Sequence, residues 1–202
     1  MPTARNMDAK PPARPRSRIG AGPDRLPHSR SVLLLVDFIN PFQFDGAEDI
    51  AADALAAAKM TVQLKRRLAR RGVPAIYAND NYGLWRSEFR DVLARCQALE
   101  GVAGEIARLL APGPRDLTIL KPRHSAFYAT PLDLLLSQMQ VRRIVLCGLA
   151  SNICVQVSAT DAFLRGYAVW APADCNAAES AARKETALEW MRRVLDCDTR
   201  PA

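Results

Sequence analysis

The chain has 202 residues, of which 49% are hydrophobic and 24% are charged, and its formal net charge is +7. Seven basic and two acidic side chains lie within the first 30 residues, so the excess charge belongs to a Pro/Arg-rich segment and the rest of the chain is nearly neutral. A nucleic-acid surface needs a basic stripe on the folded domain, and the net charge therefore does not indicate one. The length and composition favour a single domain with a sizeable core.

Residues 1–28 combine Pro, Arg, Gly and Ala with few large apolar residues. Burial cannot offset the ordering entropy of such a segment, so we predict a disordered basic tail followed by one domain over residues 29–202. The apolar run at 32–36 is too short to span a bilayer and the tail has no apolar signal region, so we expect a cytoplasmic protein without a membrane partner. The five cysteines are widely separated and form no C-x-x-C pair, and with only two histidines no zinc site is indicated.

Short apolar runs alternate with longer amphipathic runs from residue 31 onwards. The pattern predicts strands at 32–37, 73–78, 117–121, 143–148 and 167–171, and helices at 50–71, within 87–110, and at 131–140, 154–165 and 179–195. The strands read LLLV, AIYA and IVLCG, which is typical of a parallel sheet covered by helices on both faces. We therefore predict an α/β fold, a three-layer α/β/α sandwich with a mostly parallel, Rossmann-like central sheet.

Three reactive side chains fall at predicted strand ends. Asp37 closes the first strand, Lys121 closes the third, and Cys154 begins the helix after the fourth. Ligands bind such sheets at the carboxyl ends of the strands, so we expect the three side chains to share one site. No G-x-G-x-x-G fingerprint or P-loop motif points to a nucleotide instead.

Each of these residues also has a structural interpretation. A lone cysteine is more often a buried packing residue, an aspartate after a strand is usually a turn former, and a lysine is usually solvated. Together, however, they form a charge-matched set. A helix N-terminus and a lysine favour the thiolate, and a carboxylate can take the thiol proton and later activate water. This is an arrangement for covalent catalysis without histidine.

The segment GLASNIC, residues 148–154, leads from the fourth strand to the cysteine. A tight turn here can aim backbone N–H groups at a developing oxyanion, and each such donor contributes about 3 to 4 kcal/mol. The alternative is an ordinary capping turn in which Ser151 or Asn152 is the cap.

Three segments resemble the isochorismatase-like cysteine hydrolases, the superfamily that includes nicotinamidase and N-carbamoylsarcosine amidohydrolase. They are LLLVDFINPF, KPRHSAFYATPLDLLL and VLCGLASNICVQVSATDAFLRGYAVWAPADC. The resemblance implies that Cys154 is the nucleophile, Asp37 the proton shuttle and Lys121 the electrostatic partner. It also implies a cis peptide bond between Leu149 and Ala150, with the N–H groups of Ala150 and Cys154 as the oxyanion hole.

Departures from the family pattern narrow the expected chemistry. Nicotinamidases of the family add a metal site rich in Asp and His, whereas residues 38–81 contain no histidine, so we expect no metal and no cofactor. True isochorismatases lack the cysteine, and Cys154 therefore favours hydrolysis of a C–N bond in a small amide or carbamoyl substrate through a thioester. The alternative is a non-catalytic binding or scaffold protein of the same fold. The resemblance also implies a homo-oligomer.

The substrate-binding residues are expected on loops at the same sheet edge. The loop NDNYGLWRSEF follows the second strand, and its Tyr82 and Phe89 are interpreted as packing residues. His124 is interpreted as a loop residue without a catalytic role. The predicted substrate-binding residues are Asn79, Trp85, Arg86, Phe127 and Asn152.

Overall fold

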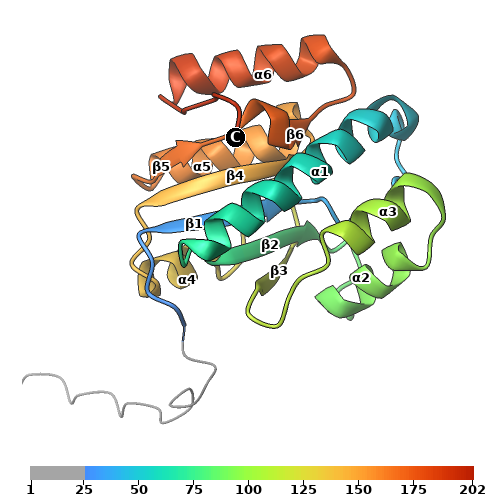
Figure 1. The fold of residues 1–202 in the computed structure, drawn as a ribbon, viewed down its shortest axis with the longest axis horizontal. Helices are drawn as coiled ribbons and strands as arrows, with labels where there is room; N and C mark the ends of the chain where they lie inside the picture. Colours follow the sequence, from blue (N-terminus) through green and yellow to red (C-terminus); the bar gives the residue numbers. More distant parts are fainter. Residues whose placement is uncertain (1–25) are drawn as a thin grey trace, which may run out of the picture.

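The computed structural model describes residues 26–202 (Figure 1). Most of the predicted basic tail, residues 1–25, therefore lies outside the described residues. Within the predicted tail, Leu26 already packs against the hydrophobic core.

Six strands form one parallel sheet in the described part of the chain. The order is β3-β2-β1-β4-β5, and the short β6 pairs with β4 beyond the end of β5. The predicted fold class is confirmed. The strands are β1 (Ser31–Val36), β2 (Ala75–Asp80), β3 (Leu117–Lys121), β4 (Arg143–Leu149), β5 (Ala168–Trp170) and β6 (Asn176–Ala177).

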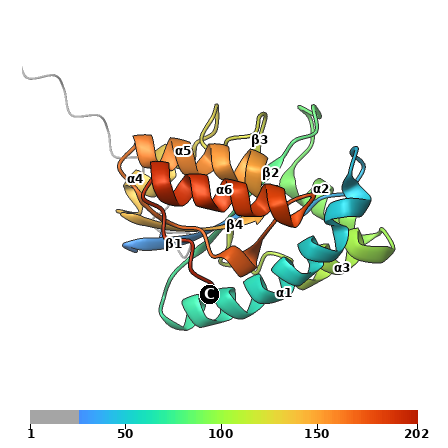
Figure 2. The same ribbon diagram turned by 90° about the horizontal axis from the view of Figure 1, so that it is seen from above.

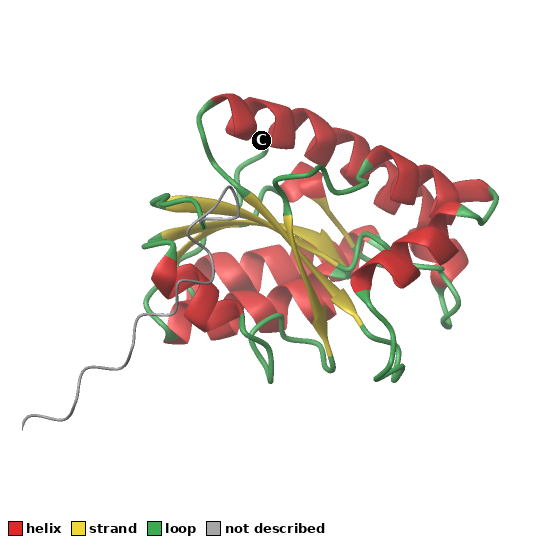
Figure 3. Ribbon diagram, turned by 90° about the horizontal axis from the view of Figure 1, so that it is seen from below, coloured by secondary structure: helices red, strands yellow, loops and turns green. Residues whose placement is uncertain are grey.

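Helices cover both faces of the sheet (Figures 2 and 3). The helices α1, α2 and α3 pack on one face, and α4, α5 and α6 pack on the other. The helices are α1 (Ala47–Arg70), α2 (Phe89–Gln97), α3 (Gly101–Leu109), α4 (Leu132–Gln138), α5 (Gln156–Leu164) and α6 (Ala181–Val194). None of them is long and apolar enough to cross a membrane, a finding that covers residues 26–202 only.

The apolar run of β1 explains the two-sided core. Leu33 and Leu35 belong to the cluster beneath α1, whereas Val32, Leu34 and Val36 belong to the cluster beneath α4 and α5. Successive side chains of a strand point to opposite faces, so a continuous apolar run is needed when both faces are covered.

The structure adds details that the sequence pattern did not predict. The segment 87–110 forms two helices, because the chain turns between them and Gly101 adopts a φ of 70°, in the left-handed region that favours glycine. A π-helical turn, Ser151–Val155, precedes α5, so the cysteine lies in this turn rather than at the first residue of α5. The strand β6 was also not predicted.

The strand order reverses direction between β1 and β4. The chain moves outward from β1 in one direction through β2 and β3, and in the other direction through β4 and β5. This reversal lies between β1 and β4, and ligands of open α/β sheets bind outside the carboxyl ends of the strands at such a point.

Candidate active site

Asp37 follows β1 directly and is held in an uncommon backbone conformation. Its φ is 53°, in the left-handed region that aspartate tolerates better than most residues. The residue is 5% exposed, and its Oδ1 accepts a hydrogen bond from the backbone N–H of Asp80 at 2.8 Å. The carboxylate is therefore fixed at the end of β2 as well as at the end of β1.

Lys121 ends β3 and is completely buried. Its Nζ lies 2.7 Å from Oδ2 of Asp37 and donates to the carbonyl of Arg123 at 3.2 Å and to Sγ of Cys154 at 3.6 Å. An ammonium has three hydrogens, so these three contacts use all of its donors. Because β2 lies between β3 and β1, the long lysine side chain is what allows the end of β3 to reach Asp37.

Cys154 lies in the π-helical turn after β4 and is the one cysteine of the five that is not buried. The peptide bond between Leu149 and Ala150 is cis, as the resemblance implied. The structure thus brings together Asp37, Lys121 and Cys154, which lie up to 117 positions apart in the chain.

The sulfur does not have the low pKa that a helix N-terminus and a lysine would give it. Burial raises the pKa of the Cys154 thiol, the negative charge of Asp37 raises it further, and Lys121 offsets only part of this. The ammonium of Lys121, which we expected to favour the thiolate, is therefore outweighed by burial and by the charge of Asp37. The sulfur carries its proton until a base removes it.

The two ionic groups also have shifted pKa values. Burial raises the pKa of the Asp37 carboxyl, and the Lys121 ammonium acts against that shift. Burial acts to lower the pKa of Lys121, but Asp37, Cys154 and Asp80 together outweigh it, so the pKa of Lys121 is raised and the ammonium stays charged. A carboxylate with a raised pKa is a better proton acceptor than an ordinary aspartate.

Two further titratable side chains, to which the sequence analysis gave no role in the site, lie beside Asp37, Lys121 and Cys154. Oδ2 of Asp80 is 3.8 Å from Nζ of Lys121. Nδ1 of His124 is 3.7 Å from Sγ of Cys154, although we interpreted this residue as a loop residue without a role. The position of Asp80 at the end of β2 is a signal that could have revealed it, because the same criterion selected Asp37 and Lys121. No comparable signal marks His124.

Two of the predicted substrate-binding residues hold the structure together instead. Asn79 is fully buried, and its amide nitrogen donates to the carbonyl of Ile39 at 2.7 Å, which fixes the loop after β1, while its Oδ1 has no hydrogen-bond partner among residues 26–202. Phe127 is 4% exposed and packs against Tyr167, with ring centroids 6.1 Å apart. A side chain in the core does not fit the role of a pocket wall, because the aromatic ring anchors its loop beneath α5.

The other predicted substrate-binding residues are either exposed to solvent or have a side-chain oxygen without a hydrogen-bond partner in the described part of the chain. Trp85 is 80% exposed on the loop after β2, and Arg86 beside it is also exposed. Asn152 is half-buried, and its side-chain oxygen has no hydrogen-bond partner among residues 26–202. Tyr82 donates to the carbonyl of Ile39 at 3.3 Å, and Phe89 packs edge-on against Tyr77, in line with their interpretation as packing residues.

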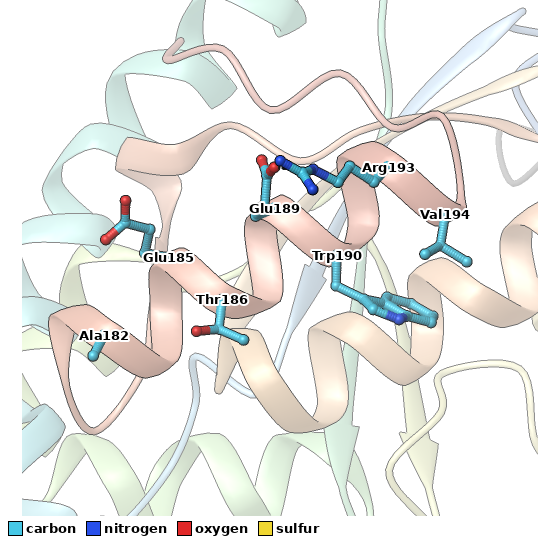
Figure 4. A pocket seen from close by; sticks show the side chains of 7 residues that line it. All are labelled: Ala182, Glu185, Thr186, Glu189, Trp190, Arg193 and Val194. Atoms are coloured by element: carbon cyan, nitrogen blue, oxygen red, sulfur yellow. Dashed lines mark ion pairs between the residues drawn. The ribbon is translucent and has the colours of Figure 1, made fainter.

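The best-formed hollows on the surface of residues 26–202 lie away from Asp37, Lys121 and Cys154. Figure 4 shows one of about 480 Å³ on the outer face of α6, lined by residues such as Glu189 and Trp190 and by none of the cluster described above. Within residues 26–202, no three His, Cys, Asp or Glu side chains are grouped so that they could hold a metal ion.

Residues 31–199 match the family model of the isochorismatase domain. The chain belongs to the isochorismatase family. Among curated relatives, this isochorismatase-family chain is 39% identical over 163 residues to YaaI of Bacillus subtilis, an uncharacterized isochorismatase family protein, covering 81% of this chain and 89% of the relative. It is also 37% identical over 98 residues to the ureidoacrylate amidohydrolase RutB of an Enterobacter species, over 44% of this chain and 43% of RutB.

Solved structures share the fold of this isochorismatase-family chain. The nicotinamidase of Staphylococcus aureus superimposes with a TM-score of 0.66 and 21% identity, covering 86% of this chain and 98% of that one. The N-carbamoylsarcosine amidase of Thermoplasma acidophilum gives a TM-score of 0.66 and 23% identity, covering 86% and 96%.

Proposed function

We propose that the protein is a cysteine hydrolase that cleaves the C–N bond of a small amide or carbamoyl compound through a thioester on Cys154. The observation that carries the proposal is the contact of one buried ammonium, that of Lys121, with both the Asp37 carboxylate and the Cys154 sulfur. A thiol beside a carboxylate of raised pKa supplies a nucleophile together with its base.

In the first half of the proposed reaction, Asp37 takes the thiol proton as Sγ of Cys154 attacks the carbonyl carbon. A C–S bond forms and the carbonyl oxygen becomes an oxyanion, for which we assign the N–H groups of Ala150 and Cys154 as donors. The oxyanion then collapses, the C–N bond breaks, and the nitrogen leaves with the proton that Asp37 received. In the second half, water replaces sulfur at the carbonyl carbon and the thiol is restored.

Lys121 has an electrostatic role in this scheme. Its positive charge offsets the negative charge that moves from the carboxylate to the sulfur, so the proton transfer occurs within a group of nearly constant total charge. Because Lys121 is fully buried, water does not screen this effect.

The relatives support an amide-type substrate. RutB is named for hydrolysis of ureidoacrylate, and two of the structural neighbours are a nicotinamidase and an N-carbamoylsarcosine amidase. All three named activities release nitrogen from a carbonyl carbon. We also propose a cytoplasmic location, which rests on the sequence alone.

The test is a panel of small primary amides, ureides and N-carbamoyl compounds with detection of released ammonia. Wild-type protein should release ammonia from at least one member and should carry an acyl adduct in intact-mass spectra after rapid quenching. The Cys154→Ala variant should do neither, while Cys96→Ala, which alters a buried cysteine away from the cluster, should keep the adduct. Absence of both signals over the whole panel would favour the alternative of a non-catalytic binding protein.

A further inference from the structure

The imidazole of His124 occupies a side of the sulfur that the scheme above leaves unused. Asp37 and Lys121 are buried, 5% and 0% exposed, so they approach Cys154 from the interior. His124 is exposed, and its Nδ1 lies 3.7 Å from Sγ. The sulfur is thus placed between an ionic pair on the protein side and an imidazole on the solvent side.

The loop that carries His124 is fixed on both sides of it. On one side the carbonyl of Arg123 accepts from Lys121 at 3.2 Å. On the other side Ser125 donates a hydrogen bond to Asp161, and the N–H of Ala126 donates to the hydroxyl of Ser158 at 2.9 Å. An exposed side chain on a fixed backbone can hold a defined position, which a group that transfers protons requires.

The two halves of the proposed reaction need a base in two different places. In the first half the base must reach the thiol proton, and Asp37 lies with Lys121 on that side. In the second half the base must take a proton from a water molecule that arrives from solvent and attacks a carbonyl carbon bonded to Sγ. Asp80 and Lys121 hold the two oxygens of Asp37 on the buried side, beside the thiol but away from the solvent from which the water arrives.

We propose that His124 is a catalytic residue that acts as the general base in hydrolysis of the thioester. Its imidazole takes one proton from water as the water oxygen bonds to the carbonyl carbon. The C–S bond then breaks, the carboxylic acid is released, and the imidazolium returns the proton to the sulfur to restore the thiol. Imidazole is the group that most often transfers protons at neutral pH. This inference rests on the proposed function.

The experiment separates the two halves with 4-nitrophenyl acetate, whose leaving group departs without needing an acid. The release of 4-nitrophenolate reports acylation, and intact-mass spectra report how long the acetyl group stays on Cys154. For His124→Gln we expect acylation within about twofold of wild type and loss of the acetyl group roughly 100-fold slower, because general base catalysis contributes about that much or more. The matched control is His28→Gln, which changes the other histidine of the chain at the opposite edge of the sheet and should leave both rates unchanged.

Each outcome is decisive. A long-lived acetyl-enzyme in His124→Gln alone supports the role. Equal slowing of both steps would show that the imidazole only positions the sulfur, and unchanged rates would show that Asp37 serves both halves; either result overturns the proposal for His124. Failure of wild-type protein to form an acetyl adduct at Cys154 would instead overturn the covalent route itself.

Discussion

Cys154 differs from the other four cysteines in both accessibility and charge. The others are buried, whereas Cys154 contacts Lys121 and lies within the influence of Asp37. Asp37 raises the pKa of the Cys154 thiol and Lys121 lowers it. Removing one charge or the other should therefore change the reactivity of Cys154 in opposite directions.

We predict that Asp37→Asn increases the rate at which iodoacetamide alkylates Cys154 at neutral pH, while it abolishes hydrolysis. The carboxylate raises the pKa of the thiol, so its removal increases the thiolate fraction, by roughly tenfold or more for a charge at this range. Lys121→Met should have the reverse effect on alkylation, since the ammonium lowers that pKa. Peptide mass spectrometry of each cysteine measures the rates. Uniform labelling of all five cysteines in folded protein would contradict this account.

The same ion pair also determines stability. Lys121→Met leaves the Asp37 carboxylate buried without its partner, which costs about 3 to 5 kcal/mol of the free energy of unfolding. The control is Lys59→Met, because Lys59 pairs with Glu105 on the surface with side chains about half exposed, and such pairs contribute about 0 to 1 kcal/mol. Urea unfolding followed by circular dichroism compares the two variants. Similar losses of unfolding free energy in both would contradict a stabilising role for the buried pair of Lys121 and Asp37.

At the scale of single residues, the sequence predicted the cluster because its members follow the ends of parallel strands. It could not predict the net pKa of Cys154, because the desolvation of the sulfur depends on how the loops close around it. It also could not predict that the loop after β3 turns His124 toward the sulfur. The side chains of Asn79 and Phe127 were misassigned for a similar reason, since a loop position alone does not distinguish a pocket wall from the core.

At the scale of elements, the strands were predictable because their apolar runs are continuous and bounded by charged or glycine residues. The short β6 has only two residues, too few to form a recognisable pattern. The π-helical turn Ser151–Val155 carries no periodic signal of its own and follows from how the turn joins β4 to α5.

The close approach of β1 and β4 gives a prediction at this scale. Gly148 is paired with Val36, and a Cβ added to Gly148 would lie 2.3 Å from the carbonyl oxygen of Val36. We therefore expect Gly148→Ala to push the two strands apart just below Asp37 and Cys154, to lower the free energy of unfolding by about 3 kcal/mol or more, and to impair hydrolysis.

The control for this prediction is Gly113→Ala, where an added Cβ would lie 3.5 Å from the Asp116 side chain, an ordinary contact. It should leave both stability and hydrolysis close to wild type. If Gly148→Ala proved equally mild in urea unfolding, the strands would have more freedom at this point than the register indicates.

At the scale of the whole molecule, exposed apolar side chains favour association between copies of the chain. Val194 at the end of α6 is 53% exposed, near the partly buried Trp190 (Figure 4), and α5 ends with Phe163 and Leu164, the latter 73% exposed. Apolar surfaces of this kind on folded domains commonly mark protein interfaces. Together with the resemblance, they lead us to expect a homo-oligomer.

Analytical ultracentrifugation tests this expectation. Wild-type protein should sediment as a species larger than 22.2 kDa, and the double variant Leu164→Asp, Val194→Asp should shift toward the monomer. Glu105→Lys, an exposed charge reversal on α3, serves as the control and should sediment like wild type. A wild-type monomer at micromolar concentration would contradict the expectation.

The three donor hydrogens of Lys121 connect separate regions of the molecule, namely the end of β1, the loop that carries His124, and the turn that carries Cys154. Loss of one proton from this nitrogen would remove the positive charge and leave two hydrogens for three acceptors, so the contacts that join these regions would weaken together. Because the pKa of Lys121 is raised by folding, its contribution to stability is complete below the ordinary lysine value of about 10.4 and disappears only as the pH rises beyond it. As the pH rises into the strongly alkaline range, the folded structure and the arrangement of the active site should therefore be lost together, in a single titration step.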